Sequence, residues 1–411
     1  MKITRLSTAV IEANYDWVLV RLDAAGGLFG IGEAYMGPGL TAILREMAPL
    51  VCGMSAEDPE LIVRRLRACV IHAGPGVAWH AIAGIETACL DLLGKALKLP
   101  VAKLLGGRYR DSVRVYADCH AGDALDSLSP MLQPRQLHWL GGAPAAEAAI
   151  SLKHHGWDKH ESTLPPVSAY SERAGQMAAR GFTALKFDAD IPTPYPTDEY
   201  DRSLSRREIE FVVERLSAVR SAIGSAVDLA VDCHWNYNTG DAAKLIKALE
   251  PLDLLWVEDP IPPESIADMA ALQAGTALTL ATGENHYQPI DFRRLLGEGG
   301  LRILAPDVQK VGLFAAKEIG RMADTHAAAL ALHNISSPVG FAAAAHAAAA
   351  IPNCLTLEWH GASVPFFNEL LCDGPYIENG RIQVGDRPGL GIELNLDVAN
   401  KYRKLSEPFF E

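Results

Sequence analysis

From about Val113 onward, short runs rich in β-branched and aliphatic residues alternate with segments of helical length. Strands joined by helices pair in parallel through right-handed crossovers, and eight such units at this length indicate a modified (β/α)₈ TIM-type barrel in the α/β class. A doubly wound open sheet is the alternative, but no glycine-rich phosphate-binding motif follows any strand. The predicted strands are 113–118, 183–188, 227–232, 254–258, 279–283, 302–306, 329–333 and 355–358.

Residues 1–112 lack this rhythm and predict a separate α+β domain, with strand-like runs followed by a helix at Ala78–Leu97. The barrel is expected at 113–365, and the tail at 366–411 is expected to return and pack on the first domain. Between the first barrel strand and its helix lies a long insertion, residues 123–168. Loops of this length are usually functional or disordered, so we expect a lid over the barrel mouth, with a solvated insertion as the alternative.

Composition excludes several classes of protein. The chain has 37 basic and 50 acidic residues and a formal net charge of −13, which is unsuited to binding nucleic acid or an anionic membrane surface. Its seven cysteines form no CxxC pair, and the N-terminus has no signal-peptide pattern, so we expect a reduced, cytoplasmic protein. The most apolar stretch, 341–351, is far shorter than a membrane span.

The C-terminal ends of barrel strands are where function resides in this architecture. Three consecutive predicted strands end in one carboxylate each: Asp232, Glu258 and Glu284, spaced 26 residues apart. Each carboxylate taken alone can be a helix N-cap. Three in register would repel one another unless a cation held them, and an all-oxygen ligand set favours Mg²⁺.

Further polar side chains end the other strands. Asp307 and His333 lie on neighbouring strands, and an Asp beside a His fixes its tautomer and raises its basicity. Strand alternation puts His234 on the same face as Asp232, and Lys186 on the same face as Asp188. A buried structural histidine and a lysine that serves only as counter-ion remain the alternatives. Two more candidate polar residues are Lys310, which follows the sixth predicted strand, and Glu358, which ends the eighth.

Together these segments resemble the mandelate racemase subgroup of the enolase superfamily, and within it the acid-sugar dehydratases. The resemblance covers nearly the whole chain. It rests on AIAGIETACLDLLGKALKLPVAKLLGG (81–107), GFTALKFD (181–188), VDCHWN (231–236), WVEDPIPP (256–263), TGEN (282–285), APDVQKVG (305–312), LHN (332–334), LEW (357–359) and RPGLGIEL (387–394). It implies a capping domain built from both termini, one Mg²⁺ per active site, homo-oligomers and a sugar acid substrate that loses its α-proton.

The resemblance also implies roles for individual residues. Asp232, Glu258 and Glu284 correspond to metal ligands, and His333, oriented by Asp307, to the base. His234 corresponds to the acid that helps the β-hydroxyl to leave. Lys186 adds positive charge near the intermediate, and Glu358 hydrogen-bonds the substrate carboxylate, which requires that it carry or share a proton. The implied reaction is dehydration of an aldonate to a 2-keto-3-deoxy sugar acid, catalysed by a hydro-lyase.

One position departs from the pattern. Racemases of this group often carry Lys-x-Lys on the second strand, and the second lysine is the opposing base; here that position is Asp188, a candidate substrate contact. This favours β-elimination. An epimerase, a racemase, a cycloisomerase and a catalytically silent relative are the alternatives. The capping loop containing Trp17 should close over the substrate. Lys310, His286 and His360 are further candidate contacts, and both of these histidines can instead be packing or surface residues.

Overall fold

The structure, a computed structural model, describes residues 1–121, 137, 139, 164–195, 198, 201–360, 364–374 and 376–411. Eight parallel strands form a closed barrel, in which each strand pairs with the next and the last pairs with the first. The predicted (β/α)₈ architecture is therefore confirmed. The strands are β4 (Ser112–Cys119), β5 (Ala184–Asp188), β6 (Asp228–Asp232), β7 (Trp256–Glu258), β8 (Leu280–Thr282), β9 (Ile303–Leu304), β10 (Ala329–Leu332) and β11 (Cys354–Trp359).

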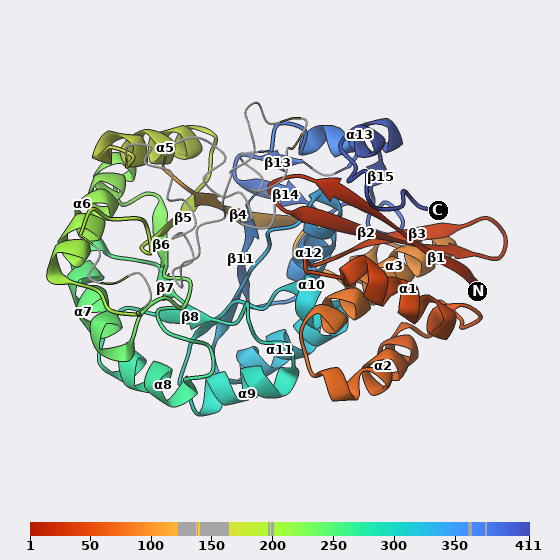
Figure 1. The fold of residues 1–411 in the computed structure, drawn as a ribbon, viewed down its shortest axis with the longest axis horizontal. Coiled ribbons are helices and arrows are strands. Elements are labelled where there is room, and N and C mark those ends of the chain that lie inside the picture. Colours follow the sequence, from red (N-terminus) through yellow and green to blue (C-terminus); the bar gives the residue numbers. More distant parts are fainter. Residues whose placement is uncertain are drawn as a thin grey trace.

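Helices cover the outside of the barrel (Figure 1). Helix α6 (Arg206–Ile223) begins with a capping box. The Ser205 hydroxyl accepts a hydrogen bond from the Glu208 N–H, and the Glu208 carboxylate accepts one from the Ser205 N–H. The apolar face of this helix, from Ile209 to Ile223, is buried against the strands. The helices are α5 (Val167–Ala179), α6 (Arg206–Ile223), α7 (Thr239–Leu249), α8 (Ile266–Ala274), α9 (Pro289–Gly297), α10 (Val308–Val311), α11 (Leu313–Thr325) and α12 (Pro338–Ala350).

The capping domain begins with three antiparallel strands that pack on a long helix, α3. The packing is very close, because a Cβ atom at Gly30 or Gly32 of β3 would lie 2.1 or 2.4 Å from a backbone oxygen of α3. By length and composition α3 can cross a membrane, but most of it is buried in this protein. The elements are β1 (Ile3–Glu12), β2 (Asp16–Ala24), β3 (Phe29–Ala34), α1 (Leu40–Val51), α2 (Pro59–Cys69), α3 (Val77–Leu97) and α4 (Val101–Leu104).

The C-terminal tail contacts both the cap and the barrel. The backbone of Gly389 exchanges hydrogen bonds with Leu99 and Val101 of the cap, and the Phe410 N–H donates to Thr8. The pairing of β14 with the barrel strand β4 in antiparallel register was not expected from the sequence. The elements of the tail are β12 (Leu371–Asp373), β13 (Ile377–Glu378), β14 (Arg381–Gln383), β15 (Glu393–Leu394) and α13 (Leu396–Lys401).

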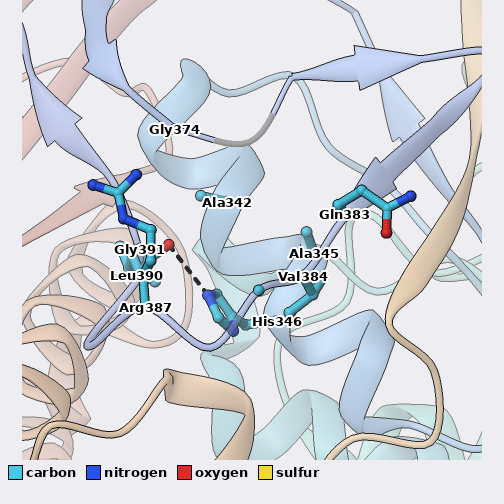
Figure 2. A pocket seen from close by; sticks show the side chains of 10 residues that line it. Ala342, Ala345, His346, Gly374, Gln383, Val384, Arg387, Leu390 and Gly391 are labelled. Atoms are coloured by element: carbon cyan, nitrogen blue, oxygen red, sulfur yellow. Dashed lines mark hydrogen bonds between the residues drawn. The ribbon is translucent and has the colours of Figure 1, made fainter.

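A pocket lies where the tail crosses α12 (Figure 2). His346 lines this pocket, and the Nε2 atom of this histidine lies 3.2 Å from the carbonyl oxygen of Leu390. Burial lowers the pKa of His346 to about 4, so its ring is neutral at physiological pH. None of the residues that we predicted for catalysis lines this pocket. We therefore read the pocket as part of the seam between tail and barrel.

The carboxylate of Glu33 is one of the links between the cap and the barrel. Glu33, at the end of β3, is 2% exposed, and its oxygens accept hydrogen bonds from the N–H groups of Ser337 and Gly340, each at 2.9 Å, and from the Ser337 hydroxyl. These donors form the N-terminus of α12, where backbone N–H groups lack partners within the helix and a negative charge is stabilised.

Replacement of Glu33 by Ala should therefore destabilise the protein. The substitution leaves three buried donors without a partner, and we expect a loss of about 3 kcal/mol in the free energy of unfolding. Urea denaturation followed by circular dichroism measures this loss. Glu46→Ala, on the exposed face of α1, is the matched control and should change little. Equal stability of both variants would show that the carboxylate does not hold the cap to the barrel.

Candidate active site

The three carboxylates predicted at consecutive strand ends meet at the mouth of the barrel. Asp232 ends β6, Glu258 ends β7, and Glu284 follows β8. All three are buried, and one oxygen of each lies within 4.8 Å of the others. Register explains the approach of two of them, because Asp232 and Glu258 are directly paired neighbours in adjacent parallel strands, whereas Glu258 pairs with Ala281 and Glu284 is supplied by the turn after β8. We call these three residues the carboxylate triad.

Lys186 lies against the triad from β5. Its Nζ atom is 2.7 Å from Asp232 Oδ2, 3.4 Å from Glu258 Oε2 and 2.8 Å from Glu358 Oε1. Burial alone would lower the pKa of this lysine, but the surrounding carboxylates outweigh it and raise the pKa well above its ordinary value. Lys186 is therefore a permanent cation. Glu358, near the end of β11, is one of the carboxylates that form an ion pair with it.

His333 and Asp307 form a buried dyad on the other side of the triad. The Nδ1 atom of His333 is 2.7 Å from Asp307 Oδ2, and its Nε2 atom is 3.2 Å from Glu284 Oε2. Asp307 is itself held, because its other oxygen accepts from the Gln309 N–H at 2.6 Å and starts α10. Burial opposes protonation of His333, but Glu284, Glu358 and Asp307 overcome it and raise its pKa to about 9.

His234 forms a second dyad, with a partner that we did not predict. Its Nδ1 atom is 3.0 Å from Asp190 Oδ1, and its Nε2 atom is 3.9 Å from Asp232 Oδ2. Strand alternation does not position this side chain, because β6 ends at Asp232 and His234 has a φ of 42°. The sequence signal for Asp190 was the alternation Lys-Phe-Asp-Ala-Asp at 186–190, which carries acidic side chains beyond the strand end. Asn236 donates to the other oxygen of Asp190 at 2.7 Å.

Residues of the cap face the dyad of His333. The ring of Tyr35, which follows β3, lies 6.2 Å from the His333 ring, and the Lys310 Nζ atom lies 4.1 Å from the centre of the same Tyr35 ring. Lys310 is fixed there because it donates to the Glu284 carbonyl at 2.7 Å. Tyr35 was missed because nothing in the sequence near it marks a barrel position.

The other predicted contacts differ in position, and Asp188 lies beside the site, with its Oδ1 atom 3.9 Å from His234 Nδ1. Trp17 is 2% exposed and packs edge-on against Phe366 and Phe367, and its contact with a substrate stays a prediction. His286 packs against Phe292, with ring centres 6.0 Å apart. Asp188 and His360 belong to a neighbouring group of side chains and contact His120 and Asp118. Most of the predicted lid at 123–168 lies outside the described residues.

The triad has the chemistry of a site for a hard divalent cation. All of its donors are carboxylate oxygens, which Mg²⁺ prefers. Glu258 Oε1 is buried and makes no hydrogen bond to any described residue, so it has a lone pair to offer. Burial is the main cause of the strongly raised pKa of Glu258, with Asp232 and Glu358 adding to it. A bound cation would relieve this cost, so the residues present fit the group.

Comparisons with known proteins agree with this geometry. Residues 4–106 match the family model described as mandelate racemase / muconate lactonizing enzyme, N-terminal domain, and residues 169–398 match the model described as enolase C-terminal domain-like. The chain belongs to the mandelate racemase/muconate lactonizing enzyme family of the enolase superfamily. It is an enzyme, a lyase of the hydro-lyase type.

The similar proteins include named dehydratases. A D-xylonate dehydratase of Haloferax volcanii is 34% identical, with 100% of this chain and 91% of that protein covered. A D-galactonate dehydratase of Verminephrobacter eiseniae is 28% identical, with coverages of 96% and 92%. Among solved structures, a mandelate racemase/muconate lactonizing enzyme-like protein from Rubrobacter xylanophilus has a TM-score of 0.88 and 35% identity, with coverages of 100% and 99%.

The protonation states of His333 and Asp259 at the barrel mouth predict how the affinity for a divalent cation should depend on pH. Without the cation, His333 has a pKa of about 9, and that of Asp259, beside Glu258, is raised to about 8 by burial and by Glu284 and Asp232. A cation on the triad cancels the negative charge that holds these protons, so its binding should release them. Affinity should therefore rise from neutral pH to about pH 9. Calorimetric titration in buffers of different ionisation enthalpy measures both effects, and a pH-independent affinity would contradict the prediction.

Proposed function

We propose that this enzyme dehydrates a sugar acid of the aldonate type to a 2-keto-3-deoxy sugar acid, with Mg²⁺ as cofactor. One observation carries the proposal: two His–Asp dyads border the carboxylate triad from different sides. His333–Asp307 approaches it at Glu284, and His234–Asp190 approaches it at Asp232. Elimination of water across a carbon–carbon bond needs a base at the α-carbon and an acid at the β-hydroxyl, and the two dyads supply one each.

Asp232, Glu258 and Glu284 would hold the Mg²⁺ ion. When bound, the ion stabilises the negative charge that develops on the substrate carboxylate after the α-proton has gone. Lys186 contributes a fixed positive charge to the same region, because its ammonium group is buried between Glu358 and the triad. We assign Glu358, whose Oε2 accepts from the Asn334 N–H at 3.0 Å, to a hydrogen bond with the substrate carboxylate, in which one proton is shared between the two carboxyl groups.

His333 is assigned to removal of the α-proton. Its Nδ1 atom donates to Asp307, so the free lone pair is on Nε2, the atom that faces Glu284. The proton moves to Nε2, and the C–H electron pair passes into the substrate as an enolate. Asp307 then stabilises the imidazolium that results.

His234 is assigned to protonation of the leaving hydroxyl. Its Nδ1 atom is held by Asp190, which keeps the ring cationic and leaves Nε2–H as the donor. The C–O bond at the β-carbon breaks, water leaves with the proton from Nε2, and the enol product tautomerises to the 2-keto-3-deoxy acid. Burial opposes the charge on His234, but Asp232, Asp190 and Asp188 raise its pKa well above the ordinary value.

Dehydration is favoured over racemisation by the contact of Asp188. Racemisation needs a second base on the opposite face of the α-carbon, and Asp188 occupies the sequence position of that base in the racemases that the chain resembles. Its Oδ2 atom is 3.0 Å from His120 Nδ1, so this carboxylate is engaged with a neighbouring ring. The named relatives support the same choice, since the two curated proteins described above are dehydratases of D-xylonate and D-galactonate.

Substitution of the two histidines should separate the two half-reactions. His333→Asn removes the base, so both dehydration and exchange of the α-proton with deuterated solvent should fall by about 10²–10⁴-fold or more. His234→Asn keeps the base and should lose dehydration while it still exchanges the α-proton. NMR of D-xylonate and D-galactonate in D₂O follows both events. His326→Asn, on the surface, is the control. Normal dehydration by both variants would overturn the mechanism.

Metal removal should abolish turnover. Dialysis against EDTA strips the cation from the triad, and added Mg²⁺ should restore activity. Glu258→Gln should behave like the stripped enzyme at any Mg²⁺ concentration, because an amide oxygen does not replace the lost charge. A coupled assay for 2-keto-3-deoxy acids measures both effects. Full activity in excess EDTA would refute the role of the metal.

A further inference from the structure

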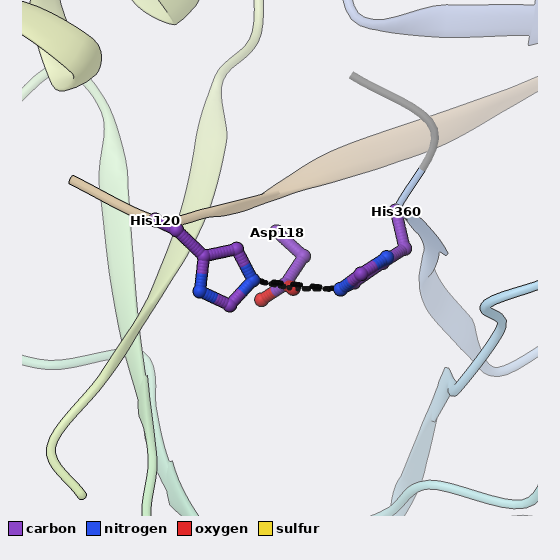
Figure 3. A group of neighbouring side chains, drawn as sticks. All are labelled: Asp118, His120 and His360. Carbon is purple, nitrogen blue, oxygen red and sulfur yellow. Dashed lines mark hydrogen bonds and ion pairs between the residues drawn. The ribbon is translucent and has the colours of Figure 1, made fainter. Parts of the chain in front are cut away.

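A second group of possible metal ligands lies at the seam where the barrel closes. Asp118 is on β4, His120 follows that strand, and His360 follows β11, which pairs with β4 to complete the barrel. Figure 3 shows the two imidazole rings approaching one carboxylate from different sides. Neither these three residues nor their neighbours belong to the carboxylate triad.

The three donor atoms have the separations of a metal site. His360 Nε2 is 3.0 Å and His120 Nε2 is 3.3 Å from Asp118 Oδ2, and the two nitrogens are 3.5 Å apart. Ligands about 2.1 Å from a tetrahedral ion lie roughly 3.4 Å from one another, so a small ion fits this triangle with little movement. Asp118 is 8% exposed, and its second oxygen, Oδ1, makes no hydrogen bond to any described residue.

The outer nitrogens of both rings are oriented as metal-bound histidines require. A ligating histidine binds through one nitrogen and donates the N–H of the other to an acceptor, often a carboxylate. His120 Nδ1 is 3.0 Å from Asp188 Oδ2, and His360 Nδ1 is 3.0 Å from the amide of Asn14. The Asn14 amide nitrogen also donates to the His360 carbonyl at 3.4 Å, while Asn14 Oδ1 is buried and makes no hydrogen bond to any described residue; a half-turn of the amide gives up the 3.4 Å contact and makes Oδ1 the acceptor for His360 Nδ1.

We infer that Asp118, His120 and His360 form a second metal site, for a divalent transition metal ion such as Zn²⁺, which fastens the first barrel strand to the last. Two imidazole nitrogens and one carboxylate are donors for Zn²⁺ or a neighbouring transition ion, whereas the all-oxygen triad suits Mg²⁺. Asp188 and Asn14 are positioning residues for the two histidines. Three protein donors leave a further position for water or another oxygen ligand.

The two sites can be distinguished by metal type. Protein stripped of metal is dialysed against micromolar Zn²⁺ in the presence of millimolar Mg²⁺. The excess Mg²⁺ keeps the carboxylate triad occupied. Bound zinc is then counted by mass spectrometry. Wild-type protein should bind one zinc ion per chain. His120→Ala and His360→Ala should lose it. Asp232→Asn, altered at the triad, and His72→Ala, on the surface, should retain it.

Two results would overturn the inference: absence of zinc uptake by the wild-type protein, which would leave the group as a hydrogen-bonded cluster, or unchanged uptake by His120→Ala. A second measurement covers variants that fail to fold. Co²⁺ added to the unaltered protein in excess Mg²⁺ should give the intense visible bands of a low-coordinate site with nitrogen donors, and only the weak bands of an all-oxygen site would also refute it. Zinc should raise the melting temperature of the wild-type protein, because the folded site gathers its ligands and binds the ion more tightly than the unfolded chain does. The test does not depend on sugar acid turnover.

Discussion

Four buried carboxylates lie together at the mouth of the barrel, where the ammonium group of Lys186 contacts three of them and that of Lys310 donates to the backbone carbonyl of Glu284. Asp232, Glu258, Glu284 and Glu358 come from different strands, so the backbone brings them together whether or not their charges are compensated. Buried like charges are costly unless they are paired or protonated. Bound protons or a metal cation must therefore neutralise the remaining negative charge. The rest of the site follows from this excess charge, since it attracts the ion and raises the pKa values of both histidines.

Much of the fold could be read from the sequence because the pattern repeats. Each of the eight predicted strands overlaps an observed one, and the greatest shortening is at 302–306, where the ladder is reduced to Ile303–Leu304. Repetition also made the triad predictable: the spacing of Asp232, Glu258 and Glu284 puts one carboxylate at or just beyond the end of each of three neighbouring strands, although only Asp232 and Glu258 are register partners and Glu284 lies beyond Ala281, the partner of Glu258. The dyad of His333 and Asp307 followed from the same rule, and the two residues form a β-bridge.

The remaining parts of the site depend on backbone beyond the strand ends, where alternation no longer holds. His234 has a left-handed conformation and meets Asp190. His120 follows the first strand directly before the long insertion, so no repeat marked it. The sequence does not show which way Trp17 faces, because a large aromatic residue in a cap strand can point to the core or to the substrate; in the structure it packs against Phe366 and Phe367.

The hairpin of β13 and β14 has a consequence for the order of assembly. Residues 112–114 of β4 pair with residues 381–383, so the first barrel strand receives part of its ladder from a segment that is synthesised after all the other barrel strands. Contacts of such large sequence separation are slow to form. During synthesis, the backbone N–H and C=O groups on that edge of β4 therefore lack their β14 partners until the other barrel strands have been made.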